Sequence, residues 1–248
     1  MRSYDLGIIG GMGSKATSVA FSRILDYTLA KKDQEHINII ILNDAKTPDR
    51  TNAIIYKETG IIEVLKDDFD ILEQLRVPLA LVACNTSHFF IRQMEIPGSI
   101  EFIDTIEETT AYLNNTYPEG RYCVLGTTGL VLSDVFSESG GQNRFVYPES
   151  SLQDGIMDII SEIKSGADIK ESAQKMRKIM EQISRENKDS IFVLACTEIS
   201  LLRDFLYYEF TCVDCMDAVL VRAIVKSGYR INELPGNYLA NIEYFTGE

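Results

Sequence analysis

Two short apolar runs of the sequence end in the same way, each at a cysteine that is followed by small polar residues. The first run is LALVA before Cys84, and the second is IFVLA before Cys196. Short apolar runs bounded by polar turn residues are typical of buried strands in a parallel sheet. Because ligands of an open parallel sheet bind beyond the carboxyl ends of its strands, both cysteines are predicted to lie where a ligand would bind.

The landmarks around the two cysteines recur in the same order in both halves of the chain. Each half carries a glycine loop after its first strand, then a turn-rich loop, the cysteine strand and a strand closed by an aspartate. The corresponding positions are Gly10 and Gly126, Cys84 and Cys196, and Asp104 and Asp214. This repeat predicts an α/β fold of two similar Rossmann-like units, each an open parallel sheet flanked by helices. If the units face each other, each contributes one cysteine to a shared cleft.

Charge and hydropathy argue against several classes of partner. The chain has 248 residues and a net charge of −13 with no basic block, so binding to nucleic acid would work against its charge. No apolar run approaches the ~20 residues of a membrane helix, and no signal-peptide pattern opens the chain. An odd number of cysteines, five, favours free thiols. We therefore expect a cytoplasmic protein with no nucleic-acid or membrane partner.

Two thiols on opposite faces of one bound carbon atom can invert its configuration. One thiolate removes a proton and the other thiol delivers a proton to the opposite face, which is general acid–base catalysis without a cofactor. Nearby donors such as Asn85, Thr86 and Thr197 are suited to lower the pKa of the thiols. A single nucleophilic cysteine paired with His88 is the alternative, but it leaves Cys196 without a role.

Four motifs in order carry a family resemblance over essentially the whole chain. They are GIIGGMG at 7–13, TPDRT at 47–51, CNTSH at 84–88 and CTE at 196–198. Together they resemble the aspartate/glutamate racemase family, and specifically its aspartate racemase-like branch. Glutamate racemases proper have an Asp-Ser opening and a Cys-Thr-His second signature. Gly10-Gly11 and Glu198 occupy those places here, so that branch fits less well.

The resemblance implies racemisation of an amino acid without a cofactor, with aspartate first and glutamate or a broader range next, and with Cys84 and Cys196 as the acid/base pair. It implies that Arg50 and Lys164 hold substrate carboxylates. It also implies a homodimer and two pseudo-two-fold related units around the cleft. The strand after each cysteine is expected to cross to the other unit, giving 1–97 with 208–248 against 98–207. The remaining residues expected to line the pocket are Gly11, Met12, Asn85, Thr86, Thr127 and Thr197.

Other functions remain open from the sequence. Relatives commonly have the sequence Thr-x-Gly-Thr in the second glycine loop. This chain has Leu130 in place of the final threonine, so it lacks a hydroxyl near the expected substrate carboxylate. The departure leaves the identity of the substrate side chain open. Another member of the superfamily, of the hydantoin racemase or maleate isomerase type, would use the same cysteines on a different acid. A catalytically idle amino-acid-binding protein is the alternative from a different class.

Three further patterns have structural interpretations. His88 is either a hydrogen-bonded structural residue or a group that tunes Cys84. Cys212 and Cys215 have no second pair of ligands spaced for zinc, so we expect them to flank the end of a strand. The dinucleotide-type glycine pattern that begins at Gly11 lacks the acidic residue at the end of the second strand, which argues against nucleotide binding.

Overall fold

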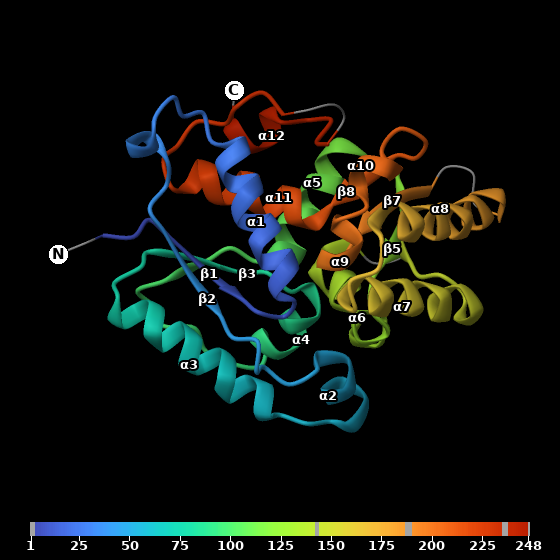
Figure 1. Cartoon of the computed structure of the whole chain (residues 1–248), viewed down its shortest axis with the longest axis horizontal. Coiled ribbons are helices and arrows are strands. Elements are labelled where there is room, and N and C mark those ends of the chain that lie inside the picture. The colour runs from blue at the N-terminus through green and yellow to red at the C-terminus, as the bar shows by residue number, and fades with distance from the viewer. Residues whose placement is uncertain (1–2, 142–143, 187–189, 235–237, 248) are drawn as a thin grey trace.

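The computed structural model of the chain describes residues 3–141, 144–186, 190–234 and 238–247. Within these ranges the named strands form two four-stranded sheets, and all neighbouring strands in each sheet run parallel (Figure 1). Helices flank both sheets. None of the described helices is both long and apolar enough to cross a membrane.

The first sheet has the strand order β2-β1-β3-β4. Its central strands β1 and β3 are buried along their whole length, as expected for parallel strands covered on both faces, whereas the edge strand β2 is half-buried. The strands are β1 (Leu6–Gly10), β2 (Ile39–Asn43), β3 (Leu79–Val82) and β4 (Glu101–Phe102). The helical segments between these strands are α1 (Ser14–Tyr27), η1 (Asp33–Glu35), α2 (Arg50–Tyr56), α3 (Gly60–Gln74), η2 (Asn85–Ser87) and α4 (His88–Ile91).

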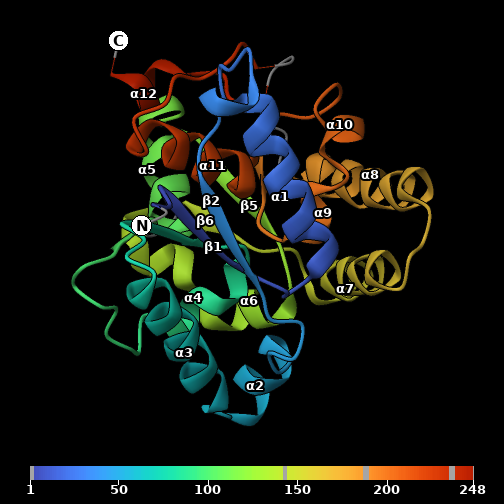
Figure 2. The ribbon, with the colours of Figure 1, turned by 60° about the vertical axis from the view of Figure 1, so that its left-hand side comes forward.

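The second sheet repeats this order as β6-β5-β7-β8. The prediction of two similar α/β units is confirmed. The strands are β5 (Arg121–Leu125), β6 (Phe145–Val146), β7 (Ser190–Leu194) and β8 (Cys212–Asp214). The helical segments from β4 to the end of the chain are α5 (Thr105–Thr116), α6 (Thr128–Ser133), η3 (Ser137–Gly141), α7 (Ser150–Lys164), α8 (Ile169–Glu186), α9 (Thr197–Ser200), α10 (Arg203–Leu206), α11 (Cys215–Lys226) and α12 (Glu243–Thr246). Figure 2 shows α7 and α8 side by side on the outside of this unit.

The strand pairing corrects one expectation. The strand after each cysteine does not cross to the other unit: β4 pairs with β3 in the first sheet, and β8 pairs with β7 in the second. The main-chain N–H and C=O groups along the outer edge of each cysteine strand need hydrogen-bond partners, and the next strand in the chain supplies them. One such bond runs from the Ile103 amide to the Ala80 carbonyl at 2.8 Å. The predicted limits 1–97 with 208–248 and 98–207 therefore assign β4 and β8 to the wrong sheets.

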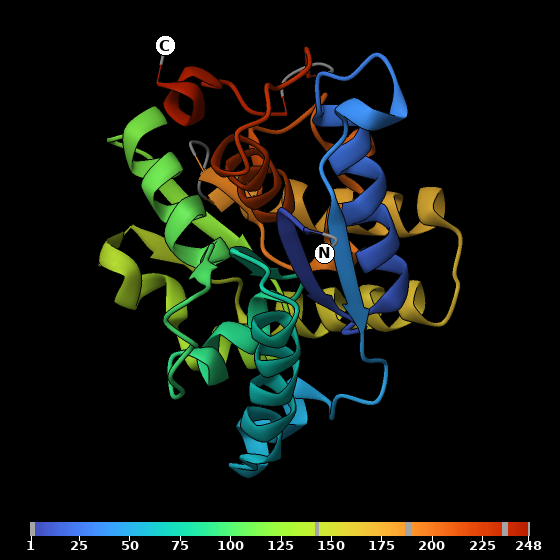
Figure 3. The same ribbon diagram turned by 90° about the vertical axis from the view of Figure 1, so that its left-hand side faces the viewer.

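The helices after these strands, rather than the strands, make contact with the opposite unit. α5 follows the first sheet but contacts η3 and β8, and α11 follows the second sheet but contacts α1 and β3. α5 and α11 also pack against each other, and Figure 3 shows them side by side in green and dark red. Their apolar side chains join one continuous core with residues of both sheets, so the two units share part of their hydrophobic stabilisation.

One buried carboxyl group in this fold has no compensating charge. Asp68 on α3 is 7% exposed, and within the described residues its Oδ2 atom has no hydrogen-bond partner. Burial, with smaller contributions from Asp44 and Asp67, raises the pKa of Asp68 from 3.8 to about 6. The folded protein therefore favours the protonated carboxyl, whose stabilising contribution is fully present below pH 3.8 and is lost as the pH rises through about 6.

We expect Asp68→Asn to raise the free energy of unfolding by on the order of 2 kcal/mol at pH 8 and to change it little at pH 4. Denaturant unfolding at both pH values measures this. Asp70→Asn, on the exposed side of the same helix, is the matched control and should leave stability unchanged at both. A loss of stability in Asp68→Asn at pH 8 would contradict the expected cost of the charge.

Candidate active site

A small pocket lies at the carboxyl ends of β3 and β7, between the two units. Its volume is about 20 Å³, which is room for about one water molecule, so an amino acid can bind only after the pocket widens. Both cysteines line it. The full set of lining residues is Met12, Asp49, Arg50, Thr51, Cys84, Asn85, Thr86, Thr127, Lys164, Ala195, Cys196, Thr197 and Glu198.

Nine of the ten predicted site residues therefore lie together, and Gly11 is the exception. Gly11 has a φ of +91°, and a Cβ atom there would come within 2.6 Å of the Asp44 backbone. Its amide donates to Thr17 Oγ1 at 3.0 Å. Gly11 thus shapes the backbone behind the pocket, where a side chain would not fit.

Four lining residues were not among the predicted ones: Asp49, Thr51, Ala195 and Glu198. Three of them stand next to predicted residues inside the TPDRT and CTE motifs, so adjacency was a usable signal. Leu130 shows the opposite outcome. Its side chain is fully buried in the core and does not line the pocket, so the site as described gives its missing hydroxyl no place beside a substrate.

His88 fixes the backbone around Cys84. The His88 ring accepts from the Thr105 amide at Nε2, 3.1 Å away, which leaves its proton on Nδ1. Nδ1 then donates to the Cys84 carbonyl at 3.1 Å. The ring is fully buried, and within the described residues no hydrogen bond joins it to the Cys84 sulfur. Of the two interpretations, the structural one therefore fits: His88 ties the end of β3 to the start of α5.

Cys196 has a different environment. Its Sγ donates to Glu198 Oε2 at 3.1 Å, and the same oxygen accepts from Thr197 Oγ1 at 3.3 Å. Burial, followed by the charge and hydrogen bond of Glu198, raises the pKa of the Cys196 thiol well above its usual value, and Lys164 acts weakly in the opposite direction.

Two cations and one hydroxyl pair complete the pocket. The Arg50 guanidinium, at the start of α2, donates to the Met12 carbonyl at 2.8 Å and so holds α2 against the loop after β1. Lys164 stands in the last turn of α7, where the helix dipole favours a positive charge. Across the pocket, the hydroxyls of Thr86 and Thr127 bond to each other at 2.9 Å and join the two units.

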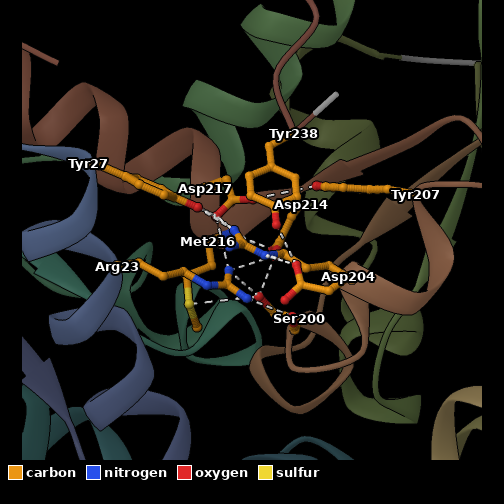
Figure 4. Close-up of polar contacts among 10 residues, drawn as sticks. Arg23, Tyr27, Ser200, Asp204, Tyr207, Asp214, Met216, Asp217 and Tyr238 are labelled. Carbon is orange, nitrogen blue, oxygen red and sulfur yellow. Dashed lines mark hydrogen bonds and ion pairs between the residues drawn. The ribbon is translucent and has the colours of Figure 1, made fainter. Parts of the chain in front are cut away.

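A buried polar cluster anchors α9, the helix that follows Cys196, to the first unit (Figure 4). Arg23 on α1 donates to Ser200 Oγ at 2.8 Å and to the Ser200 carbonyl at 2.7 Å. The same guanidinium contacts Asp214 at 2.8 Å and Asp217 at 3.0 Å. Arg23 is only 6% exposed, and the two aspartates are fully buried.

Arg203 on α10 balances the charge of this cluster. It contacts Asp217, whose Oδ1 also accepts from Tyr27 at 2.7 Å. Two arginines thus face two aspartates, so the cluster is neutral as a whole. Removing one charge from such a buried set leaves another unpaired, which is strongly destabilising. The two cysteines that flank Asp214, at positions 212 and 215, are buried, and around them the described ranges hold no group of three potential metal ligands.

Comparisons with known proteins agree with this fold. The profile of the Asp/Glu/Hydantoin racemase family matches residues 9–223. The chain is 23% identical over 227 residues, 90% of its length, to the broad specificity amino-acid racemase RacX of Bacillus subtilis (strain 168), 97% of which is covered. Its structure resembles that of Picrophilus torridus aspartate racemase with a TM-score of 0.82 and 24% identity, over 93% of this chain and 96% of the other. Glutamate racemase RacE1 from Bacillus anthracis gives a TM-score of 0.60 at 15% identity, over 90% and 81%.

The chain belongs to the Asp/Glu/hydantoin racemase family. It is accordingly an isomerase of the amino-acid racemase class.

We expect Asp217→Asn to lower the free energy of unfolding by about 3–5 kcal/mol, because it leaves positive charge uncompensated in the buried cluster. Thermal or denaturant unfolding measures this. Asp204→Asn is the matched control: its carboxylate also contacts Arg203, at 3.2 Å, but its side chain is 60% exposed, so we expect a loss below about 1 kcal/mol. Equal losses in the two variants would contradict the assignment of the anchor to the buried cluster.

Proposed function

We propose that the protein racemises aspartate, or a closely related amino acid, without a cofactor and with Cys84 and Cys196 as its two acid/base residues. The observation that carries this proposal is that both cysteines, from strands of different units, line one small pocket. Membership of a racemase family supports it.

The chemistry needs one proton removed and one returned. A thiolate takes the proton from Cα, and the electron pair left on Cα is delocalised into the α-carboxylate. The second thiol then protonates Cα from the opposite face, so the configuration is inverted and the thiolate and thiol have exchanged places. Substrate and product have the same atoms, and no oxidant or reductant is required.

The charges in the pocket support an acidic substrate. Arg50 and Lys164 are suited to bind two carboxylates, and an arginine can hold one with two parallel hydrogen bonds. A hydantoin offers no carboxylate to this pair, which makes the hydantoin alternative weaker. The Bacillus subtilis relative is a broad specificity amino-acid racemase, which supports a broader substrate range as the next possibility. The homodimer remains a prediction from the family resemblance, and the cytoplasmic location remains one from the hydropathy and opening pattern of the sequence.

Exchange of the Cα proton tests the function directly. In deuterated buffer with reductant, we expect one L-amino acid to gain deuterium at Cα and to racemise. NMR measures the deuterium uptake, and chiral chromatography measures the content of each enantiomer. Cys84→Ser and Cys196→Ser should each lower the racemisation rate by about 10²–10⁴-fold. Cys123→Ala is the control, because Cys123 is buried in β5 and does not line the pocket. Absence of exchange with every amino acid, in a folded and reduced protein, would overturn the proposal.

The contact between α2 and α6 gives a second test, which concerns substrate binding. A Cβ atom on Gly129 of α6 would come within 2.8 Å of the Thr51 Cα atom, so Gly129→Ala should push α2 and Arg50 away from the pocket. We expect KM to rise by about tenfold, which corresponds to ~1.4 kcal/mol of lost binding. Gly98→Ala is the control, since a Cβ there meets nothing within 4 Å. An unchanged KM in Gly129→Ala would show that this contact does not position Arg50.

A further inference from the structure

The Glu198 carboxylate is wedged between the Cys196 thiol and the first unit. It is only 5% exposed. One oxygen, Oε2, accepts from the Cys196 Sγ at 3.1 Å. The other, Oε1, lies 2.6 Å from where a Cβ atom on Gly13 would stand, at the start of α1. The carboxylate therefore lies between the Cys196 sulfur and the backbone of Gly13, where the missing side chain leaves it room.

This placement favours one protonation state of Cys196. An ionised carboxylate can only accept hydrogen bonds, so the thiol must keep its proton to make the contact. A thiolate at the same place would face a carboxylate of like charge in a buried site, where the repulsion is weakly screened. Burial and Glu198 raise the pKa of Cys196 accordingly.

The surroundings of Cys84 differ. Within the described part of the chain, no carboxylate oxygen lies within hydrogen-bonding distance of the Cys84 sulfur. The other charged groups that line the pocket are two cations and one further carboxylate, namely Arg50, Lys164 and Asp49. Lys164 opposes the effect of Glu198 on Cys196, but more weakly. The two thiols are therefore inequivalent although their strands are equivalent.

We propose that Glu198 is a positioning residue that holds Cys196 as the resting proton donor, which leaves Cys84 to supply the thiolate that removes the first proton. The inference rests on the proposed racemisation for its role in the reaction, but the state of the Cys196 thiol is independent of it. After one turnover the proton has moved from Cys196 to Cys84, and the free enzyme returns to its resting form when solvent takes the proton from Cys84 and supplies one to Cys196.

This inequivalence has a defined kinetic form. The two enantiomers have equal free energy in solution, so the equilibrium constant is one and kcat/KM must be the same in both directions. The preference for one resting form therefore appears as unequal kcat values that are matched by unequal KM values. Glu198→Gln removes the negative charge and keeps the shape, so it should bring the two kcat values closer together.

The decisive experiment follows each cysteine by NMR. The full-length reduced protein is labelled with [3-¹³C]cysteine, the signals are assigned with Cys84→Ser and Cys196→Ser, and the pH is varied. We expect the Cys196 signal to keep its thiol position up to about pH 9 in the wild type. In Glu198→Gln its midpoint should fall by about one pH unit or more. Asp49→Asn is the matched control: it removes a pocket carboxylate that is not hydrogen-bonded to Cys196, and the midpoint should fall by less than half as much.

The titration of the wild-type protein tests the proposal even if the variants fail to fold. A Cys196 signal that titrates below about pH 8 overturns the proposal. An unmoved midpoint in Glu198→Gln, or an equal shift in Asp49→Asn, also overturns it. The titration does not require turnover. A protein that fails to racemise any amino acid but shows the expected Cys196 behaviour would refute the proposed function and keep the assignment of Glu198.

Discussion

The contact of Arg23 with Ser200 and Asp214 is the interaction on which the arrangement of this site depends. The pocket has walls from two units, so its shape is set by how those units meet. Arg23 belongs to the helix after the first glycine loop, and Ser200 ends the short helix after Cys196. The guanidinium thus links the glycine loop of one unit to the cysteine of the other through buried hydrogen bonds, which cannot be exchanged for water without cost. The Thr86–Thr127 pair makes a second, lighter link at the pocket itself.

The parts of this structure that could be predicted from the sequence are those that local pattern controls. The apolar runs before Cys84 and Cys196 identify buried strands, and the rule for parallel sheets places their ends at one edge. The Arg23 cluster could not be predicted in this way. Arg23 and Asp214 are 191 positions apart, and an arginine on an amphipathic helix is normally exposed. The crossing of helices rather than strands was missed for a related reason, because the partners of α5 and α11 in the opposite unit are distant from them in the sequence.

The internal repeat does not make the two cysteines chemically equivalent. The two units share strand order, and Asp104 and Asp214 both accept from amides at the start of the following helix. The side chains after the two cysteines differ. Cys84 is followed by the Asn85 amide and the buried His88 imidazole, whereas Cys196 is followed two residues later by the Glu198 carboxylate. The repeat therefore duplicates the scaffold while the residues just past each strand differentiate the two halves of the site. On a shared scaffold, function resides in such site residues rather than in the fold itself.

The small volume of the pocket has a consequence for the fate of a reactive intermediate. A carbanion next to a carboxylate is quenched by any acid that reaches it, and water is the most abundant acid present. In the proposed racemisation, a site with room for about one water molecule leaves few competitors for the protonating thiol. The contacts at Gly13 and Gly129, where a Cβ atom would come within 2.6 Å of Glu198 and 2.8 Å of Thr51, permit the two units to approach so closely.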